Sequence, residues 1–172
     1  DYHKLHTEIC DEFDWDSNTK IVLFVGRLDG AQKNPAFALE VTKICISKDS
    51  AVRLLMVGDG ADRRLELEGM VETWGLQDSI RFLGLRSDVP RLMAGADLLL
   101  FPSVCEGLGM VAVEAQAAGL RVLASDAVPH ECEVIPGMVE FKSLALGSAE
   151  WAEESLRLVN QSRPDQAMCN QS

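Results

Sequence analysis

Short apolar segments alternate with segments of helical periodicity along most of this chain, and few folds accept such a pattern. The apolar segments have the length of buried strands and lie at residues 21–26, 52–58, 79–84, 97–102 and 121–125. Strands that are apolar on both faces are typical of a parallel sheet covered by helices on each side. The alternation therefore predicts a doubly wound parallel sheet, a Rossmann-like α/β fold. Ligands in such folds bind at the carboxyl ends of the strands.

Capping residues and spacing place the helices between these strands. Asn34 and Pro35 stand at the N-cap and first position of the first helix, and Gly119 follows a helix predicted at Leu108–Ala118. The remaining helices are predicted around 67–74, at 89–95 and at 148–160, and a short strand at 138–141.

The chain has the size of one domain. Its 172 residues are 47% hydrophobic, which is enough for one complete core. Residues 1–20 are polar and acidic and are interpreted as a lead-in linker, residues 21–160 as the folded domain, and residues 161–172 as a disordered tail. Because Asp1 stands where an initiator Met is expected, we expect the chain to be part of a longer protein.

Charge and cysteine content argue against several classes of function. The net charge of −11 disfavours binding to nucleic acid or to an anionic membrane, because both need clustered Lys and Arg. The five cysteines include no close pair, which favours neither a zinc site nor a disulfide framework and fits a reducing cytoplasm. Cys105 has no His near it in sequence and is interpreted as a small buried spacer rather than a nucleophile. Neither a signal-peptide pattern nor a membrane-spanning apolar run is evident.

Two glutamates flank the loop that leads into the Leu108–Ala118 helix. Glu106 precedes Gly107, Leu108 and Gly109, whose N–H groups at a helix N-terminus would be free to bind an anion. Glu114 follows, and eight residues of helical rise would separate the two acids by about 12 Å. In a ligand with a central diphosphate, one acid could then contact the chemical groups on one side of the diphosphate, and the other acid the groups on the other side. Alternatively, one glutamate caps the helix and the other is solvated.

The turns after the first two strands do not match the common nucleotide-binding motifs. The turn at 26–35 lacks the three-glycine spacing of dinucleotide folds, the next turn has Arg63 where the third glycine belongs, and no P-loop is present. The first turn does supply Arg27 and Lys33. Two cations facing the glycine loop suit a diphosphate, which gains charge as its leaving-group bond breaks. Either cation alone is more often an ordinary surface residue.

Three segments carry a family resemblance: VGRLDGAQKN, LLMVGDG and IRFLGLRSDVPRLMAGADLLLFPSVCEGLGMVAVEAQAAGLRVLASD. They resemble the nucleotide-binding C-terminal domain of the family-4 retaining glycosyltransferases, in particular the bacterial capsular and exopolysaccharide branch. The resemblance covers about residues 20–160 and implies that the chain is one half of a GT-B enzyme.

Residue roles follow from this resemblance. It implies that Arg27 and Lys33 bind the diphosphate, that Glu114 binds the ribose hydroxyls, and that Glu106 contacts the donor sugar. The further positions that it implies around the base, phosphates and sugar are Gly58, Leu85, Arg86, Gly107, Leu108 and Gly109. The loop 125–131 lacks the paired glycines common in the family, so no contacts are transferred to it. His130 and Glu131 in that loop are interpreted as solvated.

The implied reaction is the transfer of a sugar from a nucleotide donor, expected to be UDP-linked, to an acceptor hydroxyl with retention, in polysaccharide biosynthesis. No metal or other cofactor is expected, because no acidic cluster has Mg²⁺-like spacing. Expected partners are the nucleotide sugar and a missing N-terminal acceptor-binding domain. The expected location is the cytoplasm, with the full-length enzyme peripheral at the inner face of the membrane. Two alternatives remain: a GT-B sugar-nucleotide epimerase, and a non-catalytic nucleotide- or phosphate-binding α/β module such as a receiver-like domain, which would have an acidic pocket at the strand ends.

Overall fold

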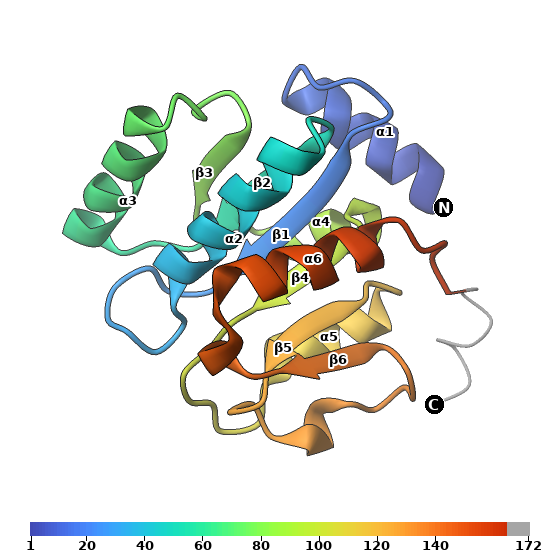
Figure 1. The fold of residues 1–172 in the computed structure, drawn as a ribbon. Helices are drawn as coiled ribbons and strands as arrows, with labels where there is room; N and C mark the ends of the chain where they lie inside the picture. Colours follow the sequence, from blue (N-terminus) through green and yellow to red (C-terminus); the bar gives the residue numbers. More distant parts are fainter. Residues whose placement is uncertain (165–172) are drawn as a thin grey trace.

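One six-stranded parallel sheet organises the computed structural model, which describes residues 1–164 (Figure 1). The strand order is β3-β2-β1-β4-β5-β6, and every neighbouring pair runs parallel. The strands are β1 Lys20–Val25, β2 Val52–Val57, β3 Ile80–Gly84, β4 Leu98–Phe101, β5 Val122–Ser125 and β6 Val139–Lys142. The predicted doubly wound α/β fold is confirmed, and the strand order reverses between β1 and β4, where such folds bind ligands.

In residues 1–164, six α-helices cover the two faces of the sheet. They are α1 Tyr2–Glu12, α2 Pro35–Lys48, α3 Ala61–Thr73, α4 Val89–Gly95, α5 Met110–Ala117 and α6 Gly147–Val159, with short 3₁₀ helices η1 His130–Cys132 and η2 Leu144–Leu146. Side chains of α1, α4 and α5 pack in one core layer, and those of α2, α3 and α6 pack in the other. In Figure 1, α2 and α6 cross in front of the sheet and α4 and α5 lie behind it.

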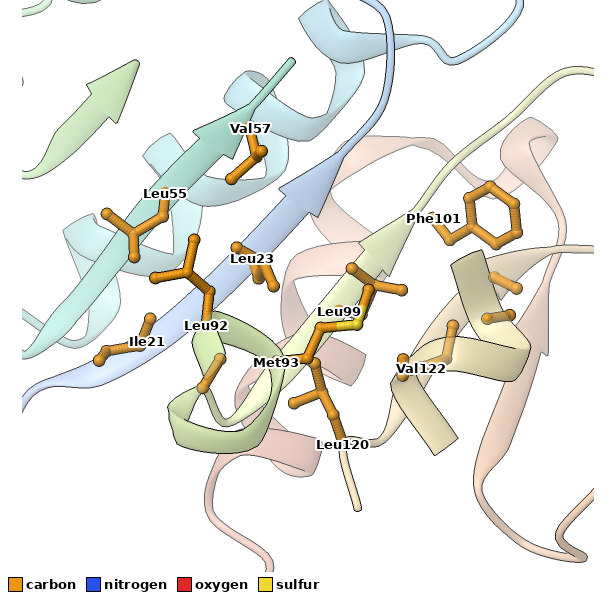
Figure 2. Close-up of a cluster of buried hydrophobic side chains, with 14 of the residues drawn as sticks. Ile21, Leu23, Leu55, Val57, Leu92, Met93, Leu99, Phe101, Leu120 and Val122 are labelled. Atoms are coloured by element: carbon orange, nitrogen blue, oxygen red, sulfur yellow. The ribbon is translucent and has the colours of Figure 1, made fainter. Parts of the chain in front are cut away.

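Strand side chains alternate strictly between the two core layers. In β1, Ile21 and Leu23 belong to the layer under α1, α4 and α5, whereas Val22 and Phe24 belong to the opposite layer. Figure 2 shows the first layer, in which Leu92 of α4 lies over β1 and its neighbours. This two-sided burial holds the strand ends, and the loops that follow them, in fixed positions.

The first twenty residues are not a lead-in linker, because most of them form α1. Asp1 caps this helix by accepting a hydrogen bond from the His3 N–H at 3.1 Å. Ile9 is fully buried, and a Cβ added to Gly95 of α4 would meet its Cδ1 at 2.5 Å. Helix α1 therefore packs tightly on α4 through this glycine. The buried face of α1 includes His6 as well as apolar residues. The sequence of this segment therefore looks polar, although its buried residues have helical spacing.

Two further boundaries differ from the sequence prediction. Helix α5 begins at Met110 rather than Leu108, because Gly109 has φ +71° and a residue in the left-handed region cannot continue a right-handed helix. The predicted disordered tail is wrong for its first residues. Arg163 donates to the Ala118 carbonyl at 2.8 Å and lies over the Tyr2 ring. The rest of that predicted tail, residues 165–172, lies outside the described residues.

Candidate functional site

Two loops leave the sheet side by side at the β1/β4 switch point. The loop 26–34 follows β1 and the loop 102–109 follows β4, and these strands are neighbours in the sheet. The Val104 N–H donates to the Gln32 carbonyl at 2.9 Å. Asn34 has φ 57° and no capping hydrogen bond; instead its amide donates across to the carbonyl that opens the second loop, at 3.1 Å. These cross-links hold the two loops in register.

The cross-linked loops bring Lys33 and Glu106 together. The Lys33 ammonium donates to Oε1 of Glu106, and the ion pair is largely enclosed, with side-chain exposures of 23% and 8%. The Ser103 hydroxyl donates to the same oxygen at 2.9 Å. The Ser103 carbonyl in turn accepts from the hydroxyl of Ser125 at the end of β5. The structure thus places one cation and one carboxylate, supported by two buried serines, at the edge where ligands are expected.

The loop between Glu106 and α5 presents backbone donors. Among residues 1–164, the N–H groups of Gly107, Leu108 and Gly109 have no hydrogen-bond acceptor, and no side chain caps α5. Gly107 and Leu108 are exposed. The start of α5 is therefore an uncapped helix N-terminus, the environment in which anions are favoured.

Glu114 lies on the exposed side of α5, and its side chain has no hydrogen bond or ion pair with any described residue. The expected separation of about 12 Å from Glu106 assumed helical rise along the whole interval. That assumption does not hold, because the helix begins only at Met110. Glu114 nevertheless projects from the helix that the glycine loop enters, with its carboxylate available to a ligand.

A pocket of about 510 Å³ opens beside the loop 26–34, between the ends of β1, β2 and β3. Four residues that the sequence analysis singles out line it together: Arg27, Gly58, Leu85 and Arg86. Leu85 is 80% exposed, so it offers an apolar surface at the pocket rim. The loop 26–34 contributes to both the pocket and the Lys33–Glu106 ion pair, because Arg27 lines the pocket and Lys33 contacts Glu106.

The two arginines of this pocket are held by carboxylates. Arg27 forms a two-point ion pair with Asp29, at 3.0 and 2.8 Å, and its side chain is 79% exposed. Arg86 donates to Asp88 and to Glu12 of α1. The hydrogen bond from Arg86 lowers the pKa of Asp88 to about 2. Arg27 is thus the more accessible cation, and Arg86 is fixed from two sides.

Gly58 is required by the close approach of β2 to β1. Its φ is +138°, and an added Cβ would lie 1.8 Å from the Gly26 carbonyl oxygen. Its N–H donates to the Gly84 carbonyl at 2.9 Å. Gly58 therefore lines the pocket with backbone alone, and no side chain larger than hydrogen fits at this position.

Sequence reasoning missed the supporting residues of the site. Ser125 ends β5, and the other three, Ser103, Asp29 and Asp88, lie in the loops that follow β4, β1 and β3. Their place at the carboxyl ends of strands is the signal by which the sequence could have indicated them. Asp88 could also have been noticed two residues from Arg86, but the second partner of Arg86, Glu12, is distant in sequence.

Three residues near the site, Cys105, His130 and Glu131, are all exposed. Cys105 is exposed rather than buried, because the loop turns outward after the buried Ser103 and leaves Val104 exposed as well. Glu131 is exposed, as expected. His130 is exposed too, but its ring stacks on Phe141 with centroids 3.9 Å apart.

Within residues 1–164, no three His, Cys, Asp or Glu side chains gather closely enough to hold a metal ion. No helix in the same part of the chain has the length and apolar character needed to span a bilayer. What the site offers is positive charge from Lys33 and Arg27, uncapped N–H groups, one enclosed carboxylate and one exposed carboxylate. This arrangement can bind a ligand with a polyanionic centre and hydroxyl groups on either side.

Known proteins resemble this chain in sequence and in fold. The chain is 33% identical over 132 residues to the putative glycosyltransferase EpsF of Bacillus subtilis, an alignment that covers 77% of this chain and 34% of EpsF. The crystal structure of WaaG, a glycosyltransferase involved in lipopolysaccharide biosynthesis, superposes with a TM-score of 0.79 at 24% identity, over 96% of this chain and 44% of that chain. Anabaena HepE in complex with UDP-glucose gives a TM-score of 0.73 at 25% identity, over 98% and 48% of the two chains.

The chain thus spans about a third of the length of EpsF and less than half of WaaG and HepE. The match to a family is more extensive. Residues 19–161, which include both loops of the switch point and the whole sheet, match the family described as Glycosyl transferases group 1. Since this match covers most of the chain, the protein belongs to the group 1 glycosyltransferases and is a glycosyltransferase domain of the GT-B type.

Proposed function

We propose that this chain is the donor-binding half of a family-4 retaining glycosyltransferase, which transfers a sugar from a nucleoside diphosphate to an acceptor hydroxyl in bacterial capsular or exopolysaccharide biosynthesis. One observation carries the proposal: Lys33 and Glu106 are paired on two cross-linked loops beside three N–H groups that no described residue accepts from. Lys33 and these N–H groups would bind the diphosphate, and Glu106 would contact the donor sugar.

The neighbouring pocket would hold the nucleoside. Leu85 and Arg86 would flank the base, and Gly58 would let it approach the backbone. Arg27 is exposed enough to turn from Asp29 toward the phosphates, and Glu114 would accept hydrogen bonds from the ribose hydroxyls. The complex of HepE with UDP-glucose supports UDP as the nucleotide.

In the transfer step, negative charge grows on the diphosphate as the bond to the sugar breaks. Lys33, Arg27 and the start of α5 would stabilise that charge, as fixed cations and oriented N–H groups do in low-dielectric sites. We propose that these groups meet the charge without a metal or other cofactor.

The acceptor side would come from a second, N-terminal domain, because the relatives are much longer than this chain. We propose that the whole enzyme works in the cytoplasm, peripherally at the inner face of the membrane, and that this domain contacts neither nucleic acid nor lipid. Membership in the group 1 glycosyltransferases speaks against a receiver-like module. Product analysis of the longer enzyme distinguishes transfer from epimerisation.

Calorimetric titration of UDP, GDP, ADP and UDP-glucose tests the proposal. Wild-type protein should bind UDP more tightly than GDP or ADP, and Glu114→Ala should weaken UDP binding by about 1–3 kcal/mol, the scale of hydrogen bonds to a charged group. Glu106→Ala should instead weaken UDP-glucose without weakening UDP. Glu72→Ala, which removes an exposed glutamate of α3, is the control. A silent Glu114→Ala together with a Glu106→Ala that abolishes UDP binding would invert the assignment of ribose and sugar.

A further inference from the structure

The Lys33–Glu106 pair uses only one of the two carboxylate oxygens. The Lys33 ammonium and the Ser103 hydroxyl both donate to Oε1 of Glu106. Among residues 1–164, no group donates to Oε2, and this oxygen is not sealed from solvent, since it is absent from the buried unpaired atoms. The carboxylate is thus held by one oxygen and presents the other.

Ser103 is held more rigidly than Lys33. It is fully buried, so its hydroxyl has no water to bind in place of Glu106. Its carbonyl accepts from the hydroxyl of Ser125, which is also fully buried. Ser125 ends β5, and β5 pairs in parallel with β4, the strand that leads to Ser103. Two adjacent strands of the sheet therefore fix the donor on Oε1.

Lys33 is the more mobile of the two donors. Its long side chain is partly exposed, and an ammonium on a flexible stem can reorient its three N–H groups. When a diphosphate occupies the site, its charge competes with Glu106 for Lys33. The Ser103 hydroxyl is the donor that stays on Oε1 under that competition.

We infer that Ser103, anchored by Ser125, is a positioning residue for the donor sugar: it holds Oε1 of Glu106 so that Oε2 meets a sugar hydroxyl. The inference rests on the proposed function, in which Glu106 contacts the sugar of a nucleotide sugar. It assigns to these serines a role in sugar recognition and none in nucleotide binding. A serine with a purely structural role would affect both ligands equally.

The experiment compares the affinities of UDP and of a UDP-sugar for the same variant by calorimetry. The UDP-sugar is whichever of UDP-glucose, UDP-galactose and UDP-N-acetylglucosamine wild-type protein binds most tightly. Ser103→Ala should leave UDP affinity within about twofold of wild type and should reduce the preference for the UDP-sugar over UDP by about tenfold, the scale of one hydrogen bond to a charged group. Ser103→Thr keeps the hydroxyl and should restore most of the preference.

Ser155→Ala is the matched control, because Ser155 is equally buried but donates to a carbonyl within α6. It should leave both affinities unchanged. Ser125→Ala should lower the sugar preference by a smaller factor than Ser103→Ala, and it decides the question if Ser103→Ala does not fold.

Each outcome separates this inference from the proposed function. If wild-type protein prefers the UDP-sugar and Ser103→Ala keeps that preference, the inference is wrong and the function stands. Equal losses for UDP and UDP-sugar would show a structural role and also overturn it, as would a wild-type protein that binds both ligands equally. If wild-type protein binds no nucleotide at all, the proposed function fails and the inference fails with it.

Discussion

At the scale of single residues, the site depends on which charges are already paired. Lys33 is enclosed with Glu106, whereas Arg27 pairs with Asp29 at the surface. Exposed ion pairs contribute little net free energy, so Arg27 can exchange Asp29 for a phosphate at small cost. Lys33 can bind a phosphate only by sharing or leaving Glu106. The two cations, which look alike in the sequence, should therefore act differently.

Replacing both Arg27 and Lys33 with Ala should weaken UDP far more than uridine, because their charge acts on the phosphates. Folding should survive, since neither side chain belongs to the core. Titration of UDP and uridine at low salt, where screening is weakest, measures the difference. Arg63→Ala, which removes a cation of α3 paired with Glu66, serves as the control. Unchanged UDP affinity in the double variant would remove both cations from the site.

At the scale of secondary structure elements, glycines decide how closely the strands and helices approach. Gly58→Ala should destabilise the protein by about 3 kcal/mol or more, because its Cβ would overlap the Gly26 carbonyl and its φ is positive. Gly69→Ala is the opposite case: it lies within α3, and an added Cβ meets nothing within 4 Å. That change should stabilise the protein by up to about 1 kcal/mol. Urea unfolding of both variants measures the two effects, and equal stabilities would contradict the described geometry.

Helix α1 is joined to the pocket loop by a cluster of charges. Arg86 and Arg91 both pair with Glu12 of α1 and with Asp88. The pKa of Asp88 is lowered to about 2, chiefly by its hydrogen bond from Arg86. A carboxylate whose pKa is lower in the folded state than its usual value near 3.9 contributes stability above pH about 4 and loses it as the pH falls through about 2.

The difference in unfolding free energy between wild type and Asp88→Asn should therefore be constant from pH 6 down to about 5 and should shrink toward pH 2.5. Urea unfolding at a series of pH values measures it. A difference that stays the same across the whole range would show that the ionised form of Asp88 is not what the arginines stabilise.

The same elements show what could be predicted from the sequence and what could not. Helix α4 lies where the spacing places it, at Val89–Gly95, because its boundaries follow from local residues. Helix α1 was missed, because its stability comes from packing on Gly95 and from contacts with residues more than seventy positions away. In the site, the sequence indicates that Lys33 faces the Glu106 loop. The hydrogen bond from Ser103 to Glu106, the one from Ser125 to the Ser103 carbonyl and the outward turn before Cys105 depend on how β4 and β5 are placed, which periodicity does not encode.

At the scale of the whole molecule, the chain has a two-layered core and, in the proposed function, only the donor side of a transfer site. We therefore predict that it folds and binds a UDP-sugar without transferring the sugar. An acceptor must be held against the anomeric carbon with water excluded, and the proposal assigns that task to the second domain. The assay is UDP release with a mass-shifted saccharide acceptor, comparing this chain with a longer protein that carries the proposed N-terminal domain.

In that longer protein, Lys33→Ala or Glu106→Ala should remove most of the transfer, through lost stabilisation of the leaving group or lost positioning of the sugar. Efficient transfer by the 172-residue chain alone would contradict the proposal that a second domain completes the site.

The central claim is that the β1/β4 switch point binds a nucleoside diphosphate, and mapping UDP onto the backbone amides by NMR tests it most directly. The largest shift changes should fall on Gly107, Leu108 and Gly109, whose N–H groups have no acceptor among the described residues, and on Gly58 and Leu85 of the pocket. The NMR signals of the backbone amides of α6, which packs on the face of the sheet opposite to α5, should not shift. An absence of shifts at millimolar UDP, or shifts confined to residues away from these two loops and the pocket, would contradict the account.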